Sequence, residues 1–154
     1  PQSPFKEKNT LMENHHRLAM VQLAIEDKSN LKACTEEFDL PSPNYTINTL
    51  VHLKKKYPQY QFTLLLGQDN IMHFDRWKAY RQILEQFQLY VYPRTQSNKI
   101  PASLLNHSNI VYFKASLLNV SATEIRNAIE NKKLLADLLP QKIQDYLRKF
   151  NLYQ

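Results

Sequence analysis

The sequence predicts an α/β fold built on a parallel, doubly wound sheet. Short apolar runs that fit strands alternate with longer segments whose apolar residues recur at helical spacing. This alternation is typical of parallel sheets joined by crossover helices. The length of 154 residues suits one domain over 1–154, and 43% hydrophobic with 22% charged residues is ordinary for a globular chain.

The N-terminal part is expected to hold one helix and one strand. Residues 1–8 carry two prolines and no periodicity, which indicates an extended loop. Thr10 and Glu13 have the spacing of a capping box before apolar residues at helical spacing, so a helix is predicted over 11–28. The next run, Leu31–Phe38, fits a strand that ends before two prolines.

The middle of the chain is expected to supply the centre of the sheet. Tyr45–Lys56 is predicted to be helical, and the nearly continuous apolar run Tyr60–Leu66 (YQFTLLL) is expected to be a strand buried on both faces. A helical turn around 69–72 and a helix over 78–87 follow. Gln88–Tyr92 is the next expected strand.

The C-terminal part continues the same alternation. Residues 94–108 are polar and irregular, which indicates a surface loop, and Ile110–Phe113 fits a fourth strand. Helices are predicted over 121–130 and 141–150. Pro140 suits the first turn of the second of these helices.

The composition restricts the class of function. The 20 Lys and Arg residues exceed the 14 Asp and Glu, and the resulting charge of +6 favours anionic partners such as nucleotides or nucleic acid. The single Cys34 cannot form an internal disulfide or a thiolate zinc site, which indicates a reducing compartment. No apolar run approaches a membrane span and no signal peptide opens the chain, so we expect a cytoplasmic protein without a membrane partner.

The chain contains one glycine, Gly67, where average usage would give roughly 11. Phosphate loops that need two or more glycines, such as G-x-G-x-x-G, are therefore excluded from these residues. Gly67 follows a predicted strand and precedes Asp69. There a glycine lets the backbone approach a ligand and a carboxylate can accept from a ribose hydroxyl. An ordinary turn with Asp69 as a helix cap is the alternative.

Parallel sheets bind ligands beyond the carboxyl ends of their strands, so residues just after the predicted strands are the candidates for function. Trp77, the only tryptophan, could stack there on a flat ligand, with a tryptophan in the core as the alternative. Arg94 follows the strand that ends at Tyr92 and is a candidate phosphate ligand or a solvated loop arginine.

The segment V-S-A-T-E-I-R (120–126) is the strongest local signal. Ser121, Thr123 and Arg126 bring hydroxyls, a helix N-terminus and a guanidinium together, which makes an anion site without glycine. Ser121 and Glu124 also have the spacing of a capping box, and both interpretations can hold.

The histidines and lysines fit no further motif. His15 and His16 are adjacent, so they point about 100° apart on a helix and cannot chelate one metal together. The other histidines lack the spacing of a zinc helix, and no metal ligands are predicted. The lysine run 54–56 suits the C-terminus of a helix.

Eight segments taken in order resemble the bacterial nicotinate mononucleotide adenylyltransferases of the nucleotidyltransferase superfamily, which have a Rossmann-like sheet. They are P-Q-S-P-F-K (1–6), H-R-L-A-M (16–20), P-N-Y-T-I-N-T-L (43–50), L-G-Q-D-N (66–70), F-D-R-W-K (74–78), P-R (93–94), V-S-A-T-E-I-R (120–126) and L-P-x-x-I-x-x-Y (139–146). The resemblance covers essentially the whole chain. It implies that the phosphate of nicotinate mononucleotide attacks the α-phosphorus of ATP, giving deamido-NAD and pyrophosphate in NAD biosynthesis.

The resemblance also assigns residues to the two substrates. The mononucleotide residues would be Lys6 and Arg94 at the phosphate, Asp69 at a ribose, Trp77 stacked on the ring, and Tyr45, Thr46 and the backbone near Lys78 at the carboxylate. The ATP residues would be Gly67, Ser121, Thr123 and Arg126. Mg²⁺ would accompany ATP without protein ligands, and no covalent enzyme intermediate is implied.

The family's first strand and its G-G-x-F-x-P-x-H-x-G-H loop have no counterpart in these residues and would precede Pro1. We therefore expect a Rossmann-like sheet that is incomplete at the N-terminus, and no catalytic histidine can be named. Two other functions stay open. The charge of +6 and nine tyrosines also fit a basic nucleic-acid-binding module, and a non-catalytic nucleotide-binding domain is the third hypothesis.

Overall fold

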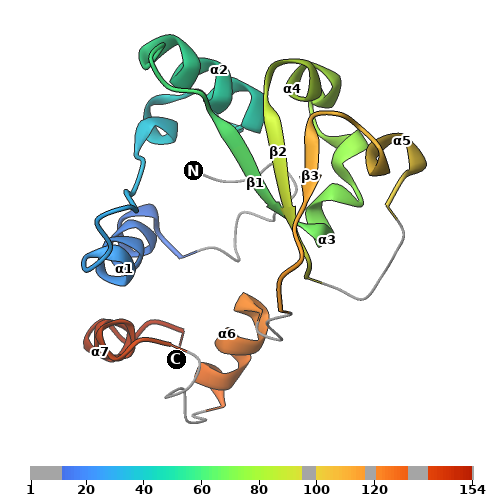
Figure 1. Ribbon diagram of the computed structural model, residues 1–154. Coiled ribbons are helices and arrows are strands. Elements are labelled where there is room, and N and C mark those ends of the chain that lie inside the picture. The colour runs from blue at the N-terminus through green and yellow to red at the C-terminus, as the bar shows by residue number, and fades with distance from the viewer. Residues whose placement is uncertain (1–11, 95–99, 117–120, 132–138, 154) are drawn as a thin grey trace. The chain divides into compact units, whose positions relative to one another are not determined.

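The computed structural model describes residues 12–94, 100–116, 121–131 and 139–153, and these fall into two compact units (Figure 1). The first unit contains the described residues from Glu36 to Ser116. The second contains those before Glu36 and those after Ser116.

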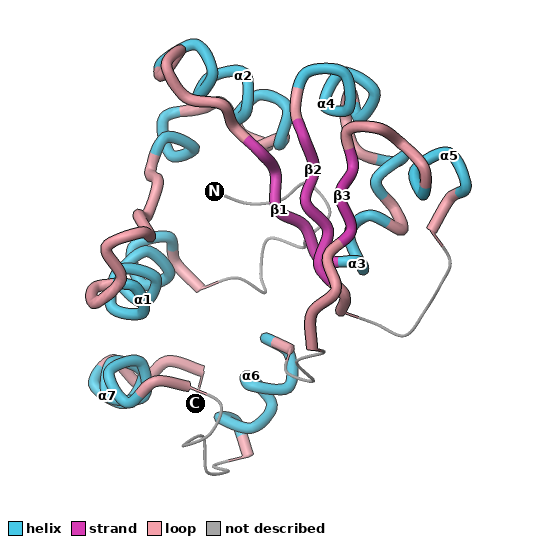
Figure 2. Tube along the Cα trace, in the orientation of Figure 1, coloured by secondary structure: helices cyan, strands magenta, loops and turns pink. Residues whose placement is uncertain are grey.

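The first unit is organised around a parallel sheet with the strand order β1-β2-β3 (Figure 2). The strands are β1 (Thr63–Gly67), β2 (Gln88–Tyr92) and β3 (Ile110–Tyr112). They coincide with three of the predicted strands, and the predicted parallel arrangement is confirmed. Since the strands run in the same direction, the segments that follow β1 and β2 leave the sheet at the same edge.

The first unit also contains helices, two of which precede β1 while the others connect the strands. They are η2 (Glu36–Asp39), α2 (Thr46–Lys56), α3 (Gln68–Ile71), η3 (Phe74–Arg76), α4 (Tyr80–Gln86) and α5 (Ala102–Leu105). The predictions of α2, α3 and α4 are confirmed. The prediction of irregular chain throughout 94–108 is wrong at α5, which begins after Pro101 and buries Leu104 in the core.

One face of the sheet carries the core of the first unit. The strand register aligns Leu89 with Ile110 and Leu66 with Val91, and all four side chains are buried. They belong to one apolar cluster that also contains residues of α2 and α4, namely Ile47, Leu50, Ile83 and Leu84. Burial of each such side chain contributes about 1.5–3 kcal/mol relative to exposure. The core thus holds the helices against the sheet.

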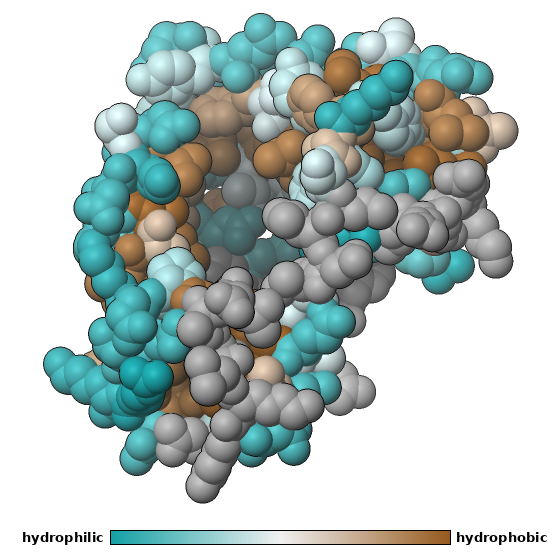
Figure 3. All heavy atoms as spheres, turned by 60° about the horizontal axis from the view of Figure 1, so that its bottom comes forward, coloured by the Kyte–Doolittle hydropathy of each residue, from teal (hydrophilic) through white to brown (hydrophobic). Residues whose placement is uncertain are grey.

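The other face carries apolar side chains that reach the surface. Leu65 is 62% exposed and Val111 is 41% exposed, although both belong to strands. Figure 3 shows that hydrophobic residues, in brown, lie among hydrophilic ones on the surface in that view. The prediction that the 60–66 strand is buried on both faces is therefore wrong at Leu65. Successive side chains of a strand point to opposite faces, and only the face of Leu66 meets the core cluster.

The second unit consists of α1 (Asn14–Ile25), α6 (Ala122–Glu130) and α7 (Gln141–Lys149), which confirms the three helices predicted there. Its small core centres on Ile143 and Leu147 of α7. The ammonium group of Lys142 pairs with the carboxylates of Glu26 and Asp27, which follow α1. His16 Nδ1 of α1 lies 2.9 Å from the hydroxyl oxygen of Tyr146 of α7.

One prediction near the N-terminal end is wrong, and a second depends on a residue outside those described. The expected strand Leu31–Phe38 is irregular chain as far as Thr35 and then the single turn η2. A strand needs a partner for its backbone groups, whereas here Leu31 is 52% exposed and the side chains of η2 bind side chains of α2. In the described chain Glu13 is the N-cap of α1, without a side-chain cap bond. The proposed capping partner Thr10 lies outside the described residues.

Among the described residues, no helix is both long enough and apolar enough to cross a membrane.

Candidate functional site

The carboxyl ends of β1 and β2 bring three predicted residues together. Gly67 ends β1 in an extended conformation with φ −76°, and the strand register places it opposite Tyr92, the last residue of β2. Asp69 lies in α3, and Arg94 follows β2 by two residues. Asp69 Oδ2 and Arg94 Nε are 3.7 Å apart, and both side chains are close to 40% exposed (43% and 37%). This ion pair is long and partly solvated, so a ligand phosphate could compete with Asp69 for Arg94.

Gly67 is required for space rather than for backbone freedom. A Cβ atom at this position would overlap the Asp69 carboxylate. It would also lie 3.3 Å from Arg94 Cδ and 3.3 Å from the Tyr92 hydroxyl oxygen. The glycine therefore leaves the room in which Asp69 and Arg94 approach each other, which supports a functional interpretation over an ordinary turn.

A pocket of about 290 Å³ opens beside Asp69. It is lined by Asp69, Asn70, His73, Arg76 and Trp77. Trp77 is half-buried, and its ring centroid lies 5.2 Å from that of the buried Phe74. Trp77 therefore packs against the core and also lines the pocket, whereas its stacking on a ligand stays a prediction. An aromatic ring held on one side by the core is a rigid surface for a flat ligand.

Four further residues of this region were not predicted from the sequence. Asn70, His73 and Arg76 line the pocket, and Tyr92 lies beside Gly67. The first two could have been found from helical spacing, since residues three and four positions apart lie on one side of a helical turn. Tyr92 could have been found from the strand register, because it pairs with the glycine of β1.

Tyr45 and Lys78 form a second feature of the first unit. Tyr45 is the N-cap of α2 and Thr46 is its first residue. The Lys78 ammonium nitrogen lies 4.2 Å from the centre of the Tyr45 ring, which is a cation–π contact. Ala79, next to Lys78, has a left-handed conformation with φ 53° at the N-cap of α4. The two segments predicted to meet at a carboxylate are thus in contact through Tyr45 and Lys78.

The V-S-A-T-E-I-R segment forms the predicted capping box at the start of α6. The Glu124 amide donates to Ser121 Oγ at 3.1 Å, and the Ser121 amide donates to a Glu124 carboxylate oxygen at 2.7 Å. The hydrogen bonds with Ser121 lower the pKa of Glu124. Arg126 Nη2 donates to Thr123 Oγ1 at 3.2 Å, so the guanidinium lies against the first turn. The Ser121 side chain therefore interacts with both the amide and the carboxylate of Glu124.

The predicted residues are divided between the two units. The first unit holds Tyr45, Thr46, Gly67, Asp69, Trp77, Lys78 and Arg94, whereas Ser121, Thr123 and Arg126 are in the second. Lys6 lies outside the described residues. Within the described part of the chain, no group of three or more His, Cys, Asp or Glu side chains could hold a metal ion.

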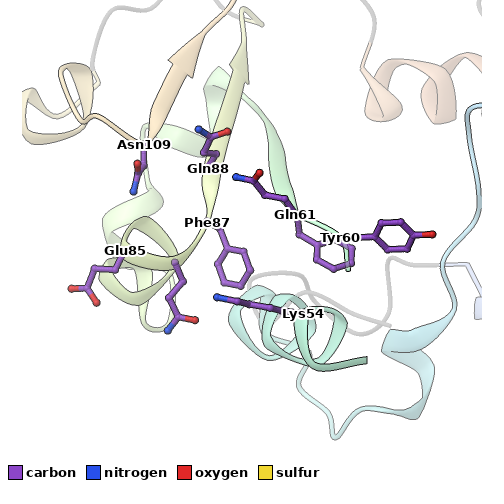
Figure 4. Close-up of a pocket in the computed structure, with 9 residues that line it drawn as sticks. Lys54, Tyr60, Gln61, Glu85, Phe87, Gln88 and Asn109 are labelled. Carbon is purple, nitrogen blue, oxygen red and sulfur yellow. The ribbon is translucent and has the colours of Figure 1, made fainter. Parts of the chain in front are cut away.

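A larger pocket, of about 400 Å³, lies at the opposite, amino ends of the strands (Figure 4). It is lined by Lys54, Tyr60, Gln61, Phe62, Glu85, Gln86, Phe87, Gln88 and Asn109. The Lys54 ammonium lies 5.5 Å from the centre of the Phe87 ring, and the Asn109 amide donates to the carbonyl of Leu84 at 2.7 Å. These polar groups therefore contact neighbouring elements of the fold. The smaller pocket is the better candidate, because ligands of parallel sheets bind at the carboxyl ends.

Comparisons with known proteins give consistent results. The profile of the family described as cytidylyltransferase-like matches residues 1–128. A Flavobacterium psychrophilum protein named "probable nicotinate-nucleotide adenylyltransferase" is 44% identical over 154 residues, which is 100% of this chain and 80% of that protein. A protein of the same name from Christiangramia forsetii is 40% identical over 100% of this chain and 79% of its own length.

Solved structures resemble the fold. One is a Plasmodium falciparum nicotinic acid mononucleotide adenylyltransferase complexed with NaAD, with a TM-score of 0.74 and 23% identity, covering 96% of this chain and 78% of that one. The same enzyme complexed with APC has a TM-score of 0.73 and 24% identity, with 93% and 77% covered. These likenesses show that the parallel sheet belongs to a Rossmann-like nucleotidyltransferase fold, as predicted.

Proposed function

The chain belongs to the cytidylyltransferase-like family, in its branch of nicotinate-nucleotide adenylyltransferases, and from this premise we propose that it transfers the adenylyl group of ATP to nicotinate mononucleotide. The observation that carries the proposal is 44% identity to a relative of that name across all 154 residues. The products are deamido-NAD and pyrophosphate, and the reaction belongs to NAD biosynthesis. Both substrates are small anionic molecules, which suits the charge of +6.

The reaction is a direct displacement at phosphorus. A phosphate oxygen of the mononucleotide forms a bond to the α-phosphorus of ATP. The bond from that phosphorus to the bridging oxygen breaks, and its electron pair leaves with pyrophosphate. The protein then has to align two polyanions and stabilise the charge between them. Such a task needs neither an enzyme nucleophile nor a paired general acid and base, and the sequence suggested neither.

The pocket at the carboxyl ends is proposed to hold the mononucleotide. Trp77 stacks on the pyridine ring, and Asp69 accepts from a ribose hydroxyl. Arg94 leaves its 3.7 Å pairing with Asp69 to bind the phosphate, together with Lys6. The exposure of Asp69 and Arg94 supports these roles, because both side chains can reach a ligand without unfolding their surroundings.

The ring carboxylate is proposed to bind near the contact between Tyr45 and Lys78. Its partners are Tyr45, Thr46 and the backbone near Lys78. The cation–π contact of 4.2 Å supports this proposal, because it joins the two segments that must act on one carboxylate.

ATP is proposed to bind through Gly67, Ser121, Thr123 and Arg126. The first turn of α6 supports this role, because it carries the Ser121 hydroxyl and the guanidinium of Arg126 at a helix N-terminus. Mg²⁺ enters as part of the substrate, bound to the triphosphate, and neutralises charge on the leaving pyrophosphate. The family profile matches residues from both units, which supports treating 1–154 as one nucleotidyltransferase domain.

The test is an assay of pyrophosphate release from ATP by the product of the complete open reading frame. Nicotinate mononucleotide and its amide analogue are supplied in parallel. We expect turnover with the nicotinate form and weaker turnover with the amide. The absence of turnover with both substrates would contradict the proposal.

A further inference from the structure

The single turn η2 contacts α2 through the side chains of two adjacent glutamates. The Glu36 carboxylate accepts from the Lys56 ammonium at 2.7 Å and from the Tyr57 hydroxyl at 3.1 Å. His52 Nε2 lies 3.0 Å from the same carboxylate. The Glu36 side chain is only 15% exposed, so these contacts fasten η2 to the C-terminal half of α2.

Glu37 contacts the other end of α2. Its carboxylate accepts from the Thr49 hydroxyl at 2.6 Å, and its backbone carbonyl accepts from the Asn44 side-chain amide at 3.0 Å. Asn44 immediately precedes Tyr45, and Thr49 lies three residues beyond Thr46. The two hydrogen bonds of Glu37 therefore enclose the pair of residues that is proposed to bind the nicotinate carboxylate.

The structure assigns Glu37 as a positioning residue for mononucleotide binding, which acts by holding Tyr45 and Thr46 in place. This inference rests on the proposed function, because it concerns the affinity of the same site for the same substrate. Both hydrogen bonds of Glu37 engage residues that flank Tyr45 and Thr46, so its proposed effect on the ligand is indirect.

The start of α2 needs such support from outside. In the part of the chain that the structure describes, α2 begins without a side-chain cap bond and without an acidic residue in its first turn. The segment between η2 and Tyr45 is irregular chain, and holding such a loop in one conformation costs about 1–2 kcal/mol per residue in entropy. Glu37 ties the loop to η2 at Asn44 and contacts Thr49 in the first turn of α2, and its carboxylate lies near the helix N-terminus, where the helix dipole favours negative charge.

The contacts of the Glu36 carboxylate with α2 are present throughout the neutral pH range. Hydrogen bonds from Lys56 first, and then from His52, lower the pKa of Glu36 from 4.5 to about 2. Its carboxylate is therefore ionised wherever the enzyme would work. Glu36 therefore gives a permanent attachment of η2 to α2 rather than a switch.

The experiment compares Glu37→Ala with Glu37→Gln and Thr49→Val in the product of the complete open reading frame. KM is measured separately for nicotinate mononucleotide and for ATP, and mononucleotide binding is measured by calorimetry. Alanine and valine each remove the hydrogen bond between Glu37 and Thr49, so we expect KM for the mononucleotide to rise roughly threefold to tenfold with KM for ATP unchanged. Glutamine keeps an acceptor oxygen and should restore most of the affinity.

Two controls separate positioning from a general loss of structure. Glu85→Ala removes an exposed glutamate from α4 in the same unit and should leave both KM values unchanged. Glu37→Ala combined with Thr49→Val should match either single variant, because both changes remove one bond. Equal rises of KM for both substrates, failure of glutamine to restore affinity, or additive effects would overturn the inference. If the wild-type protein neither turns over nor binds the mononucleotide, the proposed function itself is wrong and the inference falls with it.

Discussion

The two ends of the sheet each carry a pocket. The size of the pockets favours the amino ends as a binding site, whereas the chemistry of their side chains favours the carboxyl ends. The pocket at the amino ends has about 400 Å³, and the one at the carboxyl ends about 290 Å³. At the amino ends, Lys54 lies over Phe87 and Asn109 binds a backbone carbonyl, so these polar groups stabilise the fold. In Figure 4 the Glu85 carboxylate points away from the Phe87 ring.

The carboxyl ends differ because their polar groups are only loosely engaged. Asp69 and Arg94 stand 3.7 Å apart and partly exposed, next to a tryptophan and a glycine that leaves them room. A binding site needs groups that can exchange one partner for another, whereas a structural contact needs groups that keep their partner. Volume alone favours the amino ends, whereas the loose engagement of the polar groups favours the carboxyl ends.

The largest expected effect comes from removing the room at Gly67. Gly67→Ala would place a Cβ against the Asp69 carboxylate and force it from its position. Because misplacement of about 1 Å can cost on the order of 100-fold in rate, we expect kcat/KM to fall by about that factor. The measurement is steady-state pyrophosphate release.

A matched substitution at the amino ends, Gln88→Ala, should leave kcat/KM within twofold of the wild type. The extended backbone at Gly67 accepts alanine without strain, so the urea midpoint of Gly67→Ala should stay close to that of the wild type. Normal activity in Gly67→Ala would show that the carboxyl ends do not need this space.

A smaller effect is expected from the aromatic residues of the two pockets. Trp77→Ala should raise KM for nicotinate mononucleotide tenfold or more, because it removes a stacking surface worth about 0.5–1.5 kcal/mol together with the area that the ring covers. Tyr60→Ala, at an exposed aromatic of the amino-end pocket, is the control and should not change KM. Equal effects of the two substitutions would remove the distinction between the pockets.

Substitution of one cation at each end of the sheet, Arg94 at the carboxyl ends and Lys54 at the amino ends, should distinguish an effect on affinity from an effect on stability. Arg94→Ala should raise KM for the mononucleotide roughly fivefold to tenfold and reduce its dependence on salt, because a phosphate partner is lost. Lys54→Ala should leave KM unchanged and lower the free energy of unfolding by about 0.5–1 kcal/mol, through loss of the contact with Phe87. These are measured by kinetics at two salt concentrations and by urea unfolding. A rise in KM for Lys54→Ala would assign the amino-end pocket a role in binding.

The sequence predicted those parts of the fold whose signal is local. The helix α2 and the strands β1 and β2 lie close to their expected bounds, because the apolar pattern of each segment also decides its burial. The expected strand at 31–38 failed because Glu36 and Glu37 bind partners on α2, up to 21 residues away. The pattern of apolar and polar residues within one segment does not show which distant residues that segment binds.

The candidate site also has one part that could be predicted from the sequence and one part that could not. The approach of Asp69 to Arg94 follows from the rule that parallel strands end at one edge of the sheet. Two other features could not be predicted in this way, because they depend on side-chain directions after folding. They are the position of the Tyr92 hydroxyl beside Gly67 and the lining of the pocket by His73 and Arg76. The roles of the site residues toward substrate stay predictions.

The smallest expected effect concerns Glu36, a carboxylate that lines neither pocket and keeps its partners. Hydrogen bonds from Lys56 and His52 lower its folded pKa from 4.5 to about 2, so its contribution to stability is fully present above about pH 4.5 and is lost as the pH falls toward 2. The difference in unfolding free energy between the wild type and Glu36→Gln, from urea titrations at pH 3 to 7, should therefore be constant above pH 5 and shrink below it. A difference that does not vary across this range would mean that Glu36 is not bound as an ion. The contrast between Asp69, which must be able to leave Arg94 for a ligand, and Glu36, which keeps its partners, would then be lost.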